Sequence, residues 1–466
     1  AVVGGGAGGT ASAFFLRQLY GTDVQIDMYE PSNVLCGRVA TVEVAGRMYE
    51  AGASMLHPSN RYAKGILSKF GLKEATRPNV LISFYNGENY TFRSSEWKIV
   101  TLFRLLWTFG YDLIRLYWFE RSFLNLFDKI YSEHKHGHSF RNMSDFMYTL
   151  GQDTFINATK ISACQLYADQ GFGSNFINMM LNGGLLANYG QTCEVTGFVG
   201  AVSMAGIQPG LWSVRGGNKL LCSKLYENSS AHWIKEEVTK VSLTSGGQFA
   251  VRTSTNESNF LWLSIVIYSL YDHVIITTPI NKDTSKLDVS GACSTYCPSD
   301  DNDQRRYRKT VATFVKGKLN STKFQCESPT CPVILGTSNA TYFRTIGFHY
   351  PVDFNESTGD TIESGIYKVF SDESLTKEQI DDLFDKHDSV DEVVWLAYPK
   401  YSAPENLTSF VLNEAGLYYT SPIESAASAM EMSLISARNA ALLSFNDWYA
   451  VSEPVNNAKR NAPTEL

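Results

Sequence analysis

The glycine cluster at the start of the chain constrains its fold more than any other feature. Val2 and Val3 precede the run Gly4-Gly5-Gly6-Ala7-Gly8-Gly9, which satisfies the pattern G-x-G-x-x-G. The run predicts a strand, a glycine-rich turn and a helix over residues 10–20, followed by a second strand over residues 24–30. Elements in this order are typical of the βαβ unit that opens a Rossmann-type parallel sheet.

Three glycines and one acid in this unit have separate roles. Gly4 permits the tight turn, Gly6 lets the backbone approach a pyrophosphate, and Gly9 lets the helix pack closely on the strand. The amino terminus of the helix offers free N–H groups and a positive dipole end to the phosphates. Glu30, at the end of the second strand, is placed to accept hydrogen bonds from both ribose hydroxyls. The unit therefore predicts binding of a dinucleotide through its ADP moiety.

Length and charge are those of a globular protein with more than one domain. The 466 residues suffice for two domains, or for one large domain with a second one inserted. A net charge of −7 gives no electrostatic reason to expect nucleic acid as a partner. Aromatic residues make up 13% of the chain, which suits either an ordinary core or a large pocket for an apolar ligand.

Sequons and cysteines indicate the secretory pathway. Four of the eight cysteines lie in polar, proline-containing sequence that favours disulfide-bonded loops: Cys293, Cys297, Cys326 and Cys331. A zinc site is the alternative for these four, although no histidine is near. Because Ala1 already lies at the expected first strand, the lack of a signal peptide is uninformative. Nine N-x-S/T sequons are spread along the chain, at Asn89, Asn142, Asn157, Asn228, Asn256, Asn320, Asn339, Asn355 and Asn406.

Residues 97–131 are predicted to be helical and carry many large apolar side chains. Charged residues interrupt the stretch, so it is not expected to span a membrane; among them are Arg104, Asp112, Arg115, Glu120 and Arg121. A pair of core helices is one interpretation. The other is a membrane-facing or tunnel-lining element that admits an apolar substrate, with peripheral contact to a membrane or lipoprotein.

The remaining elements are predicted from periodicity and length. Residues 260–267 and 271–279 are expected to form two strands, because Asp272 and His273 interrupt apolar sequence that is too short to span a membrane. Residues 281–310 and 353–393 are polar and charged, which favours surface loops and a helix. The last long helix is expected over residues 424–448.

Three segments outside the first unit bear on the cofactor. Gly37-Arg38 follows Glu30 closely, and Glu50-Ala51-Gly52-Ala53-Ser54 comes next. Tyr418-Tyr419 leads into Ile423-Glu424-Ser425-Ala426-Ala427-Ser428-Ala429 near the end of the chain. With Glu237-Val238 and residues 272–279, these segments resemble the amine-oxidase superfamily of flavoproteins from one end of the chain to the other.

This resemblance implies FAD as the cofactor and places further residues at its site. Arg38 is expected along the pyrophosphate and ribityl chain, and Val238 near the adenine. The helix that follows Ile423 and Glu424 is expected to point its amino terminus at the flavin. Ala53 and Ser54 complete the predicted cofactor site.

The same resemblance implies an α/β protein. It has a Rossmann-type FAD-binding domain of the amine-oxidase-like kind and an interleaved α+β substrate domain. The FAD-binding domain is expected to be discontinuous, over residues 1–80, 190–280 and 400–466. The substrate-binding domain is expected over residues 81–189 and 281–399.

Longer strings narrow the family. They are residues 50–58 (EAGASMLHP), 85–88 (YNGE), 188–191 (NYGQ), 198–203 (FVGAVS), 211–220 (LWSVRGGNKL), 395–399 (WLAYP) and 425–433 (SAASAMEMS). In this order they resemble the prenylcysteine oxidase family. The resemblance implies a lysosomal or secreted, FAD-dependent thioether oxidase acting on S-farnesyl- or S-geranylgeranyl-cysteine. It would consume O₂ and release cysteine, a prenyl aldehyde and hydrogen peroxide.

Candidate catalytic residues follow from the same resemblance. His57 falls where related polyamine oxidases have a histidine beside the flavin. It would orient water or the substrate carboxylate, or be hydrogen-bonded beneath the flavin. Hydride transfer to a flavin requires no nucleophile, and we expect neither a Ser-His-Asp set nor a metal site. Tyr189, Trp212 and Tyr398 are expected either to line the substrate cavity or to pack in the core. Arg215 and Lys219 are expected either to bind the substrate carboxylate or to be solvated surface charges.

The sequence departs from its presumed relatives in places. Cys36 stands where the family usually has glycine, and Ser425 replaces a cysteine. Amine oxidases often carry a lysine near the flavin, on the strand that corresponds to residues 310–318 here. Either Lys316 or Val315 falls at that position, because a shift of the strand by one residue exchanges its two faces. Two other functions stay open: a secreted FAD-containing lipid carrier without turnover, and an amine oxidase with another substrate.

Overall fold

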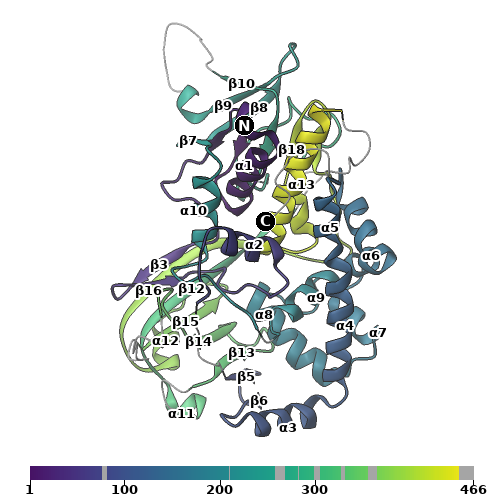
Figure 1. The fold of residues 1–466 in the computed structure, drawn as a ribbon. Coiled ribbons are helices and arrows are strands. Elements are labelled where there is room, and N and C mark those ends of the chain that lie inside the picture. The colour runs from purple at the N-terminus through teal and green to yellow at the C-terminus, as the bar shows by residue number, and fades with distance from the viewer. Residues whose placement is uncertain are drawn as a thin grey trace.

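The computed structural model describes residues 1–75, 81–208, 210–257, 268–281, 283–298, 305–326, 331–354 and 365–450. Two halves are visible in Figure 1, in which the N-terminus and helix α13 lie in the upper half. The lower half places a large sheet beside a group of helices. The α/β class predicted from the sequence is confirmed.

A six-stranded sheet forms the centre of the upper half. Val2 and Val3 form its central strand β1 and pair in parallel with Met28 and Tyr29 on one side and with Ile275 and Ile276 on the other. The strand order is β17 (Val411–Asn413), β18 (Leu417–Tyr419), β11 (Val274–Ile276), β1 (Val2–Val3), β2 (Asp27–Tyr29) and β7 (His232–Ile234). Only β17 is antiparallel to its neighbour, so the sheet has the parallel core expected of a Rossmann-type domain.

Three helices belong to this half: α1 (Ala7–Tyr20), α10 (Lys219–Glu227) and α13 (Met430–Trp448). Helix α1 begins at Ala7, three residues before the predicted start, because the last glycines of the motif already form its first turn. Helix α13 begins at Met430, later than predicted. The preceding residues Ser421–Ser425 form a 3-10 turn with Pro422 in its first positions, and Ala429 is extended.

There are also two small sheets among the described residues. One is formed by β3 (Thr41–Val44) and β4 (Arg47–Glu50) and packs against β12 (Tyr307–Leu319) and β15 (Ile366–Ser371) of the large lower sheet. Strands β8 (Val238–Leu243), β9 (Phe249–Thr253) and β10 (Ser269–Tyr271) form the other. The apolar stretch 271–279 therefore contributes to two strands, β10 and β11. The other predicted strand, over residues 260–267, lies outside the described residues.

A seven-stranded sheet dominates one side of the lower half. Its order is β16 (Phe384–Pro399), β12 (Tyr307–Leu319), β15 (Ile366–Ser371), β14 (Thr345–Phe348), β13 (Val333–Gly336), β5 (Ile82–Tyr85) and β6 (Tyr90–Arg93). The prediction of loops and a helix over 353–393 is wrong for most of its described part, which holds β15, α12 (Lys377–Leu383) and the start of β16. Strand β16 is an edge strand with many exposed side chains, so its charged sequence did not resemble a strand.

Helices fill the opposite side of the lower half. They are α3 (Lys98–Phe109), α4 (Asp112–Phe127), α5 (Lys129–Lys135), α6 (Met143–Lys160), α7 (Ala163–Asp169), α8 (Asn182–Tyr189) and α9 (Gly197–Ala205), with a π-helical turn at Phe176–Leu181. Helix α2 (Arg61–Lys69) lies against α10 and α13, and α11 (Ser321–Phe324) follows β12. The expectation of core helices over 97–131 fails for α3, where only Phe109 is buried. Among the described helices, none combines the length and the apolar character needed to cross a bilayer.

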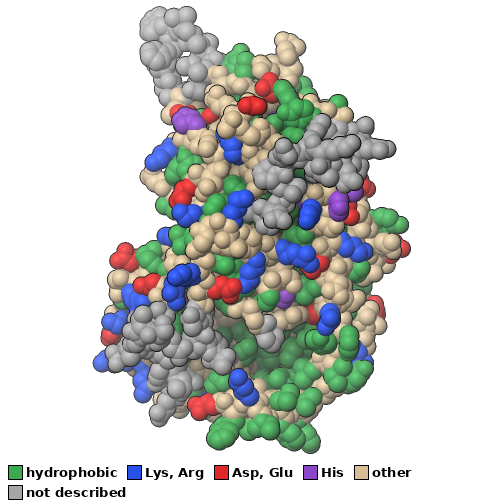
Figure 2. Space-filling model, viewed as in Figure 1, with side chains coloured by type: hydrophobic (Ala, Val, Ile, Leu, Met, Phe, Trp, Pro, Cys, Tyr) green, Lys and Arg blue, Asp and Glu red, His purple; other side chains and the backbone are tan. Residues whose placement is uncertain are grey.

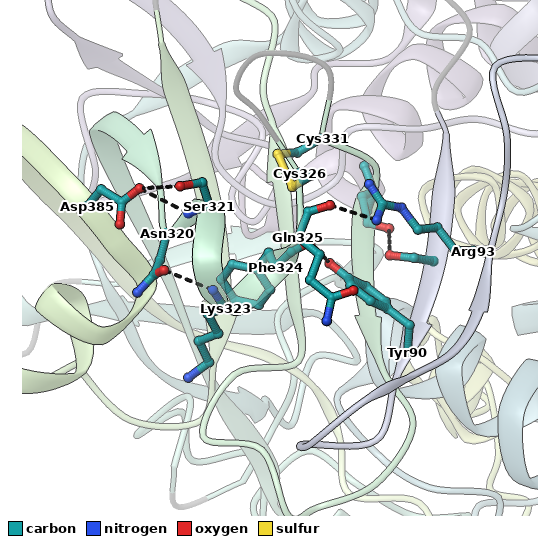
Figure 3. Close-up of a disulfide and its surroundings, with 12 residues drawn as sticks. Tyr90, Arg93, Asn320, Ser321, Lys323, Phe324, Gln325, Cys326, Cys331 and Asp385 are labelled. Atoms are coloured by element: carbon teal, nitrogen blue, oxygen red, sulfur yellow. Dashed lines mark hydrogen bonds between the residues drawn. A yellow bond between two sulfur atoms is a disulfide. The ribbon is translucent and has the colours of Figure 1, made fainter.

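All eight cysteines form disulfides, which confirms the disulfide-bonded loops predicted from sequence, and the structure decides the pairing. The pairs are Cys36–Cys222, Cys164–Cys193, Cys293–Cys297 and Cys326–Cys331. Figure 3 shows the last of these beside β6. There Arg93 donates to the carbonyl of Gln325 at 2.8 Å and the Tyr90 hydroxyl donates to that of Phe324 at 3.0 Å. The disulfide loop is thereby fixed to the sheet.

The two large sheets draw their strands from different parts of the chain. Those of the six-stranded sheet lie within residues 1–80, 190–280 and 400–466, and those of the seven-stranded sheet within 81–189 and 281–399. Helix α9, which falls in residues 190–280, nevertheless packs against α4, α6, α7 and α8. The domain boundaries proposed from the sequence stay a prediction.

Candidate functional site

The glycine motif forms a turn whose three glycines have different surroundings. Gly4 has a φ of +106°, a conformation that favours glycine. A Cβ at Gly9 would lie 1.8 Å from the carbonyl oxygen of Gly4, so only glycine permits this contact between helix and strand. A Cβ at Gly6 would meet no atom within 4 Å, because this residue faces open space. The geometry matches the tight turn expected at Gly4 and the close packing expected at Gly9, whereas the approach of a pyrophosphate to Gly6 stays a prediction.

Glu30 lies where the second strand of the motif ends. Its carboxylate accepts hydrogen bonds from the backbone N–H of Gly5 and of Ser32, both at 2.9 Å. These two bonds hold the carboxylate at the rim of the glycine turn, where a ribose bound to the sheet would lie.

Arg38, Glu424 and Tyr307 form a charged cluster on the other side of the turn. Arg38 donates to the carbonyl of Ala397 at 2.8 Å and forms an ion pair with Glu424. The Tyr307 hydroxyl donates to the second carboxylate oxygen of Glu424, and the guanidinium of Arg38 lies 5.6 Å from the centre of the Tyr307 ring. Glu424 therefore orients Arg38. The third member, Tyr307, was not predicted from sequence.

Cys36 combines a backbone conformation that favours glycine with a disulfide bond. Its φ of +92° lies in the region that favours glycine, and its sulfur bonds to Cys222 on α10. The N–H of Cys36 donates to the carbonyl of Gly5 at 2.9 Å. The loop that carries Arg38 is thus tied to the glycine turn and to α10.

A cavity of about 240 Å³ opens beside these residues. Its wall includes Gly4, Gly6, Glu30 and Arg38 from the predicted set, and also Ala53, Ile423 and Glu424. The open side of Gly6, the amino terminus of α1 and the cation of Arg38 suit a pyrophosphate. Gly9 supports the turn from behind, and Ser54 lines the neighbouring cavity instead.

A second cavity of about 300 Å³ lies between helices of the lower half and the seven-stranded sheet. Its apolar wall includes Phe123 and Phe127 of α4, Phe198 of α9 and Phe370 of β15. Six residues line both cavities, which therefore meet at this group: Gly52, Ala53, Tyr398, Ser428, Ala429 and Met430. Helix α13 begins at Met430 and directs the positive end of its dipole to this junction.

His57 lines the second cavity with a neutral imidazole. Its Nδ1 accepts from the N–H of Ser59 at 3.1 Å, so the proton lies on Nε2. Burial lowers the pKa of His57 despite a hydrogen bond with Gln208 and the charge of Asp128. Trp212, whose indole N–H donates to the carbonyl of His57 at 3.0 Å, holds the backbone here rather than lining the cavity.

Tyr189 and Tyr398 lie at the junction of the cavities with a third tyrosine, Tyr401. The Tyr189 ring contacts the edges of both others, with centroid distances of 5.2 and 5.7 Å. Its hydroxyl donates to the carbonyl of Ser428 at 3.1 Å, and the N–H of Ser428 donates to the Tyr401 hydroxyl at 2.8 Å. Burial raises the pKa of Tyr189 and raises that of Tyr398 to about 12. Both phenols stay neutral and fix the segment before α13.

Two buried acids in the second cavity were not predicted. Glu120 of α4 accepts from the Tyr167 hydroxyl at 2.7 Å, and burial raises its pKa to about 8. Its other oxygen has no hydrogen-bond partner among the described residues. Glu431 accepts from the N–H groups of Tyr62 and Ala63 at the start of α2, and burial raises its pKa to about 7. Glu431 therefore caps a helix, whereas Glu120 presents a neutral carboxyl to the cavity. In the sequence, each of these two acids looks like an ordinary charged residue of a predicted helix.

Several predicted residues lie outside both cavities. Val238 is buried in the three-stranded sheet. Arg215 lies in the loop before α10, and Lys219 is the first residue of that helix. Neither Lys316 nor Val315 of β12 lines either cavity. The buried lysine of this sheet is Lys368, which donates to the carbonyl of Glu50 at 3.1 Å. The role of Val238 near adenine stays a prediction.

Family models match nearly the whole chain. The prenylcysteine lyase model matches residues 92–457, and the model of an NAD(P)-binding Rossmann-like domain matches residues 2–70. The first match spans the strands of the seven-stranded sheet, the helices of the lower half and α13.

Solved structures share the fold at low identity. A fatty acid isomerase from P. acnes that produces CLA is 14% identical, with a TM-score of 0.61 over 94% of this chain and 96% of its own. A putrescine oxidase bound to putrescine is 12% identical, with a TM-score of 0.57 over 94% of this chain and 97% of its own.

Curated relatives are similar along their length. Prenylcysteine oxidase 1 of Bos taurus is 36% identical over 96% of this chain and 88% of its own. The Homo sapiens protein of that name is 35% identical, and prenylcysteine oxidase 1-like of Homo sapiens is 34% identical; each match covers 96% of this chain and about nine tenths of the relative. With the family model, these matches confirm the resemblance inferred from sequence: the chain belongs to the prenylcysteine lyase family.

Proposed function

We propose that the chain is an FAD-dependent oxidase that cleaves the thioether of S-prenyl-cysteine. Cysteine, a prenyl aldehyde and hydrogen peroxide would be the products, and O₂ the electron acceptor. The observation that carries the proposal is the junction of the two cavities. A site shaped for a dinucleotide opens there directly into an apolar cavity, through Gly52, Ala53, Tyr398, Ser428, Ala429 and Met430.

FAD is the cofactor that suits the first cavity. Gly4, Gly6 and Arg38 would hold its pyrophosphate, Glu30 its ribose, and the start of α13 its ring end. Bound FAD supplies hydride acceptance, with the electrons passing on to O₂.

The chain itself must position the substrate and limit water. Phe123, Phe127 and Phe198 provide an apolar wall for a farnesyl or geranylgeranyl chain. His57, neutral with its proton on Nε2, can donate a hydrogen bond to the substrate carboxylate or to one water molecule. The tyrosines around Ser428 hold the junction rigid, so that the carbon next to sulfur stays aligned.

Anaerobic mixing with farnesylcysteine tests the proposal. The flavin band should bleach on mixing, and readmitted air should restore it with formation of hydrogen peroxide. A flavin that stays oxidised would overturn the enzymatic function and leave a lipid-carrying flavoprotein. Bleaching by a short polyamine but not by farnesylcysteine would instead indicate an amine oxidase. Bleaching without peroxide in air would indicate another electron acceptor.

The proposal includes a lysosomal or secreted location. Four disulfides suit an oxidising compartment. Among the sequon asparagines whose exposure the structure describes, five are exposed, where a glycan has room: Asn89, Asn157, Asn228, Asn339 and Asn406. Digestion with an N-glycosidase after expression in secretory cells should lower the apparent mass. An unchanged mass would contradict glycosylation.

A further inference from the structure

Helix α3 turns its apolar face outward. Ile99, Leu102, Phe103, Leu106 and Trp107 follow the i, i+3, i+4, i+7, i+8 spacing of one helix face. In a soluble protein this face is normally buried in the core, but all five are exposed, Trp107 to 84%. The sequence pattern of a core helix is therefore present, and its partner is missing from the described structure.

The exposed face continues onto neighbouring residues and the start of α4. We call the whole set the aromatic surface: Trp97, Ile99, Val100, Leu102, Phe103, Leu106, Trp107, Tyr111, Ile114, Tyr117 and Trp118. It contains half of the large exposed hydrophobic residues found among the described residues. Figure 2 shows green side chains gathered at the lower end of the molecule, where Figure 1 places α3. A patch of this kind marks a binding surface.

Composition and charge identify the occupant as a lipid bilayer. Tryptophan and tyrosine are enriched where proteins meet the membrane interface, because each ring has an apolar body and a polar edge. Lys98, Arg104 and Arg121 are exposed along the same two helices, and Arg121 lies beside Tyr117. Although the whole chain has a net charge of −7, this surface offers three cations and suits anionic lipid headgroups.

The aromatic surface and the second cavity share helix α4. One side of this helix contributes Tyr117 and Trp118 to the surface, and residues of its next turns, Phe123 and Phe127, line the cavity. Figure 2 also shows a hollow lined with hydrophobic side chains above the lower end of the molecule. An apolar molecule could thus pass from a bilayer under α3 to the cavity with little exposure to water.

We infer that the aromatic surface docks the protein on an anionic bilayer, with α3 lying in the headgroup region without crossing the membrane. The docked protein would take its apolar substrate directly from the bilayer, and this second part depends on the proposed function. Docking itself requires neither substrate nor turnover.

Vesicle sedimentation of the full flavin-loaded chain tests docking. The protein should sediment with vesicles of phosphatidylserine and phosphatidylcholine, and more weakly with phosphatidylcholine alone. Phe103→Ser combined with Trp107→Ser should weaken partitioning at least about tenfold, because two exposed aromatic anchors are lost. Val390→Ser with Val394→Ser removes exposed apolar side chains from β16 and should have no effect.

Fluorescence provides a measurement on the unaltered protein. Trp97, Trp107 and Trp118 belong to the aromatic surface, so brominated lipids in the vesicles should quench tryptophan emission. Oxidation of farnesylcysteine embedded in vesicles should fall about tenfold in the Phe103→Ser, Trp107→Ser variant. Oxidation of dilute, dissolved farnesylcysteine should not change.

Three outcomes would overturn docking. The first is that the protein neither sediments with vesicles nor shows quenching, and the second is that the variant partitions as well as the wild type. The third is a dimer in sedimentation velocity that the double substitution abolishes. Such a dimer would assign the surface to a second copy of the chain. Turnover of dissolved farnesylcysteine without vesicle binding would overturn docking alone. Vesicle binding without turnover would overturn the proposed function alone.

Discussion

The two cavities are built in opposite ways. The turn of the first cavity depends on backbone geometry within a short stretch, where Gly4 has a positive φ, Gly9 has no room for a Cβ and Gly6 keeps one side open. The second cavity is built from side chains of α4, α8, α9, β15, β16 and the start of α13. A local motif therefore encodes the turn of the first cavity, whereas the second cavity exists only when distant segments pack together.

This difference predicts different responses to substitution. Changes in the glycine turn should act on folding or on flavin content. Changes in the second cavity should spare the flavin and alter pH response or turnover. The four substitutions below alternate between the cavities, from the largest expected effect to the smallest.

Gly9→Ala should have the largest effect. Its Cβ would lie 1.8 Å from the carbonyl oxygen of Gly4, so α1 must move away from β1. We expect the free energy of unfolding to fall by about 4 kcal/mol, with loss of flavin. Chemical denaturation measures this. Gly246→Ala is the control, because its Cβ makes only an ordinary contact at 3.8 Å. Equal stability of the two variants would contradict the close packing of the motif.

Glu120→Gln should change how stability depends on pH. Because the folded protein raises the pKa of Glu120 from 4.5 to about 8, the unfolded chain releases this proton at lower pH than the folded one does. Stability from this group is thus complete below pH 4.5 and is lost as the pH rises to 8. Between pH 5 and pH 8, the free energy of unfolding of the wild type should fall by about 3 kcal/mol more than that of the variant. Melting curves across this range measure the difference, and the exposed Glu88→Gln should follow the wild type.

Gly6→Ala should separate flavin binding from folding. Gly6 has φ −69° and ψ −171°, which alanine adopts without strain, and the added Cβ meets no protein atom. It would project into the space proposed for the pyrophosphate. We expect an unchanged melting temperature of the apoprotein and flavin affinity weaker by about 100-fold. Titration of the apoprotein with FAD measures this affinity. Unchanged binding would show that the cofactor does not approach this glycine.

His57→Asn should have the smallest effect and only on turnover. The asparagine oxygen can still accept from the N–H of Ser59, but the Nε2–H group is lost. We expect kcat/KM for farnesylcysteine to fall about tenfold with flavin content unchanged. A purely structural histidine would instead alter the melting temperature and leave kcat/KM unaltered.

Prediction from sequence succeeded where short-range pattern and backbone geometry coincide. The turn at Gly4, the first strand and disulfide bonding of the four loop cysteines were all expected and are confirmed. It failed for β16, whose exposed edge position allows a charged sequence, and for the start of α13, which Pro422 and the turn around it delay.

The candidate site shows the same division. Glu30, Arg38, Ala53 and Ile423 line the nucleotide cavity as expected, because they lie in motifs close to strand ends. Tyr307 and Glu120 could not be predicted. Tyr307 reaches Glu424 over 117 positions of sequence, and Glu120 looks like one more charge on a helix until burial makes it neutral.

The sequence by itself determined the Rossmann-type unit and the family. These properties depend on residue types at fixed spacing, which local sterics and chemistry translate directly into structure. Only the tertiary structure decided that the two cavities meet at Tyr398 and Ser428, that Cys36 pairs with Cys222, and that α3 exposes its apolar face. The physical reason is that the burial of a side chain and the pairing of two cysteines depend on contacts between distant segments. The apolar residues of one helix face do not show which other segment, if any, packs against them.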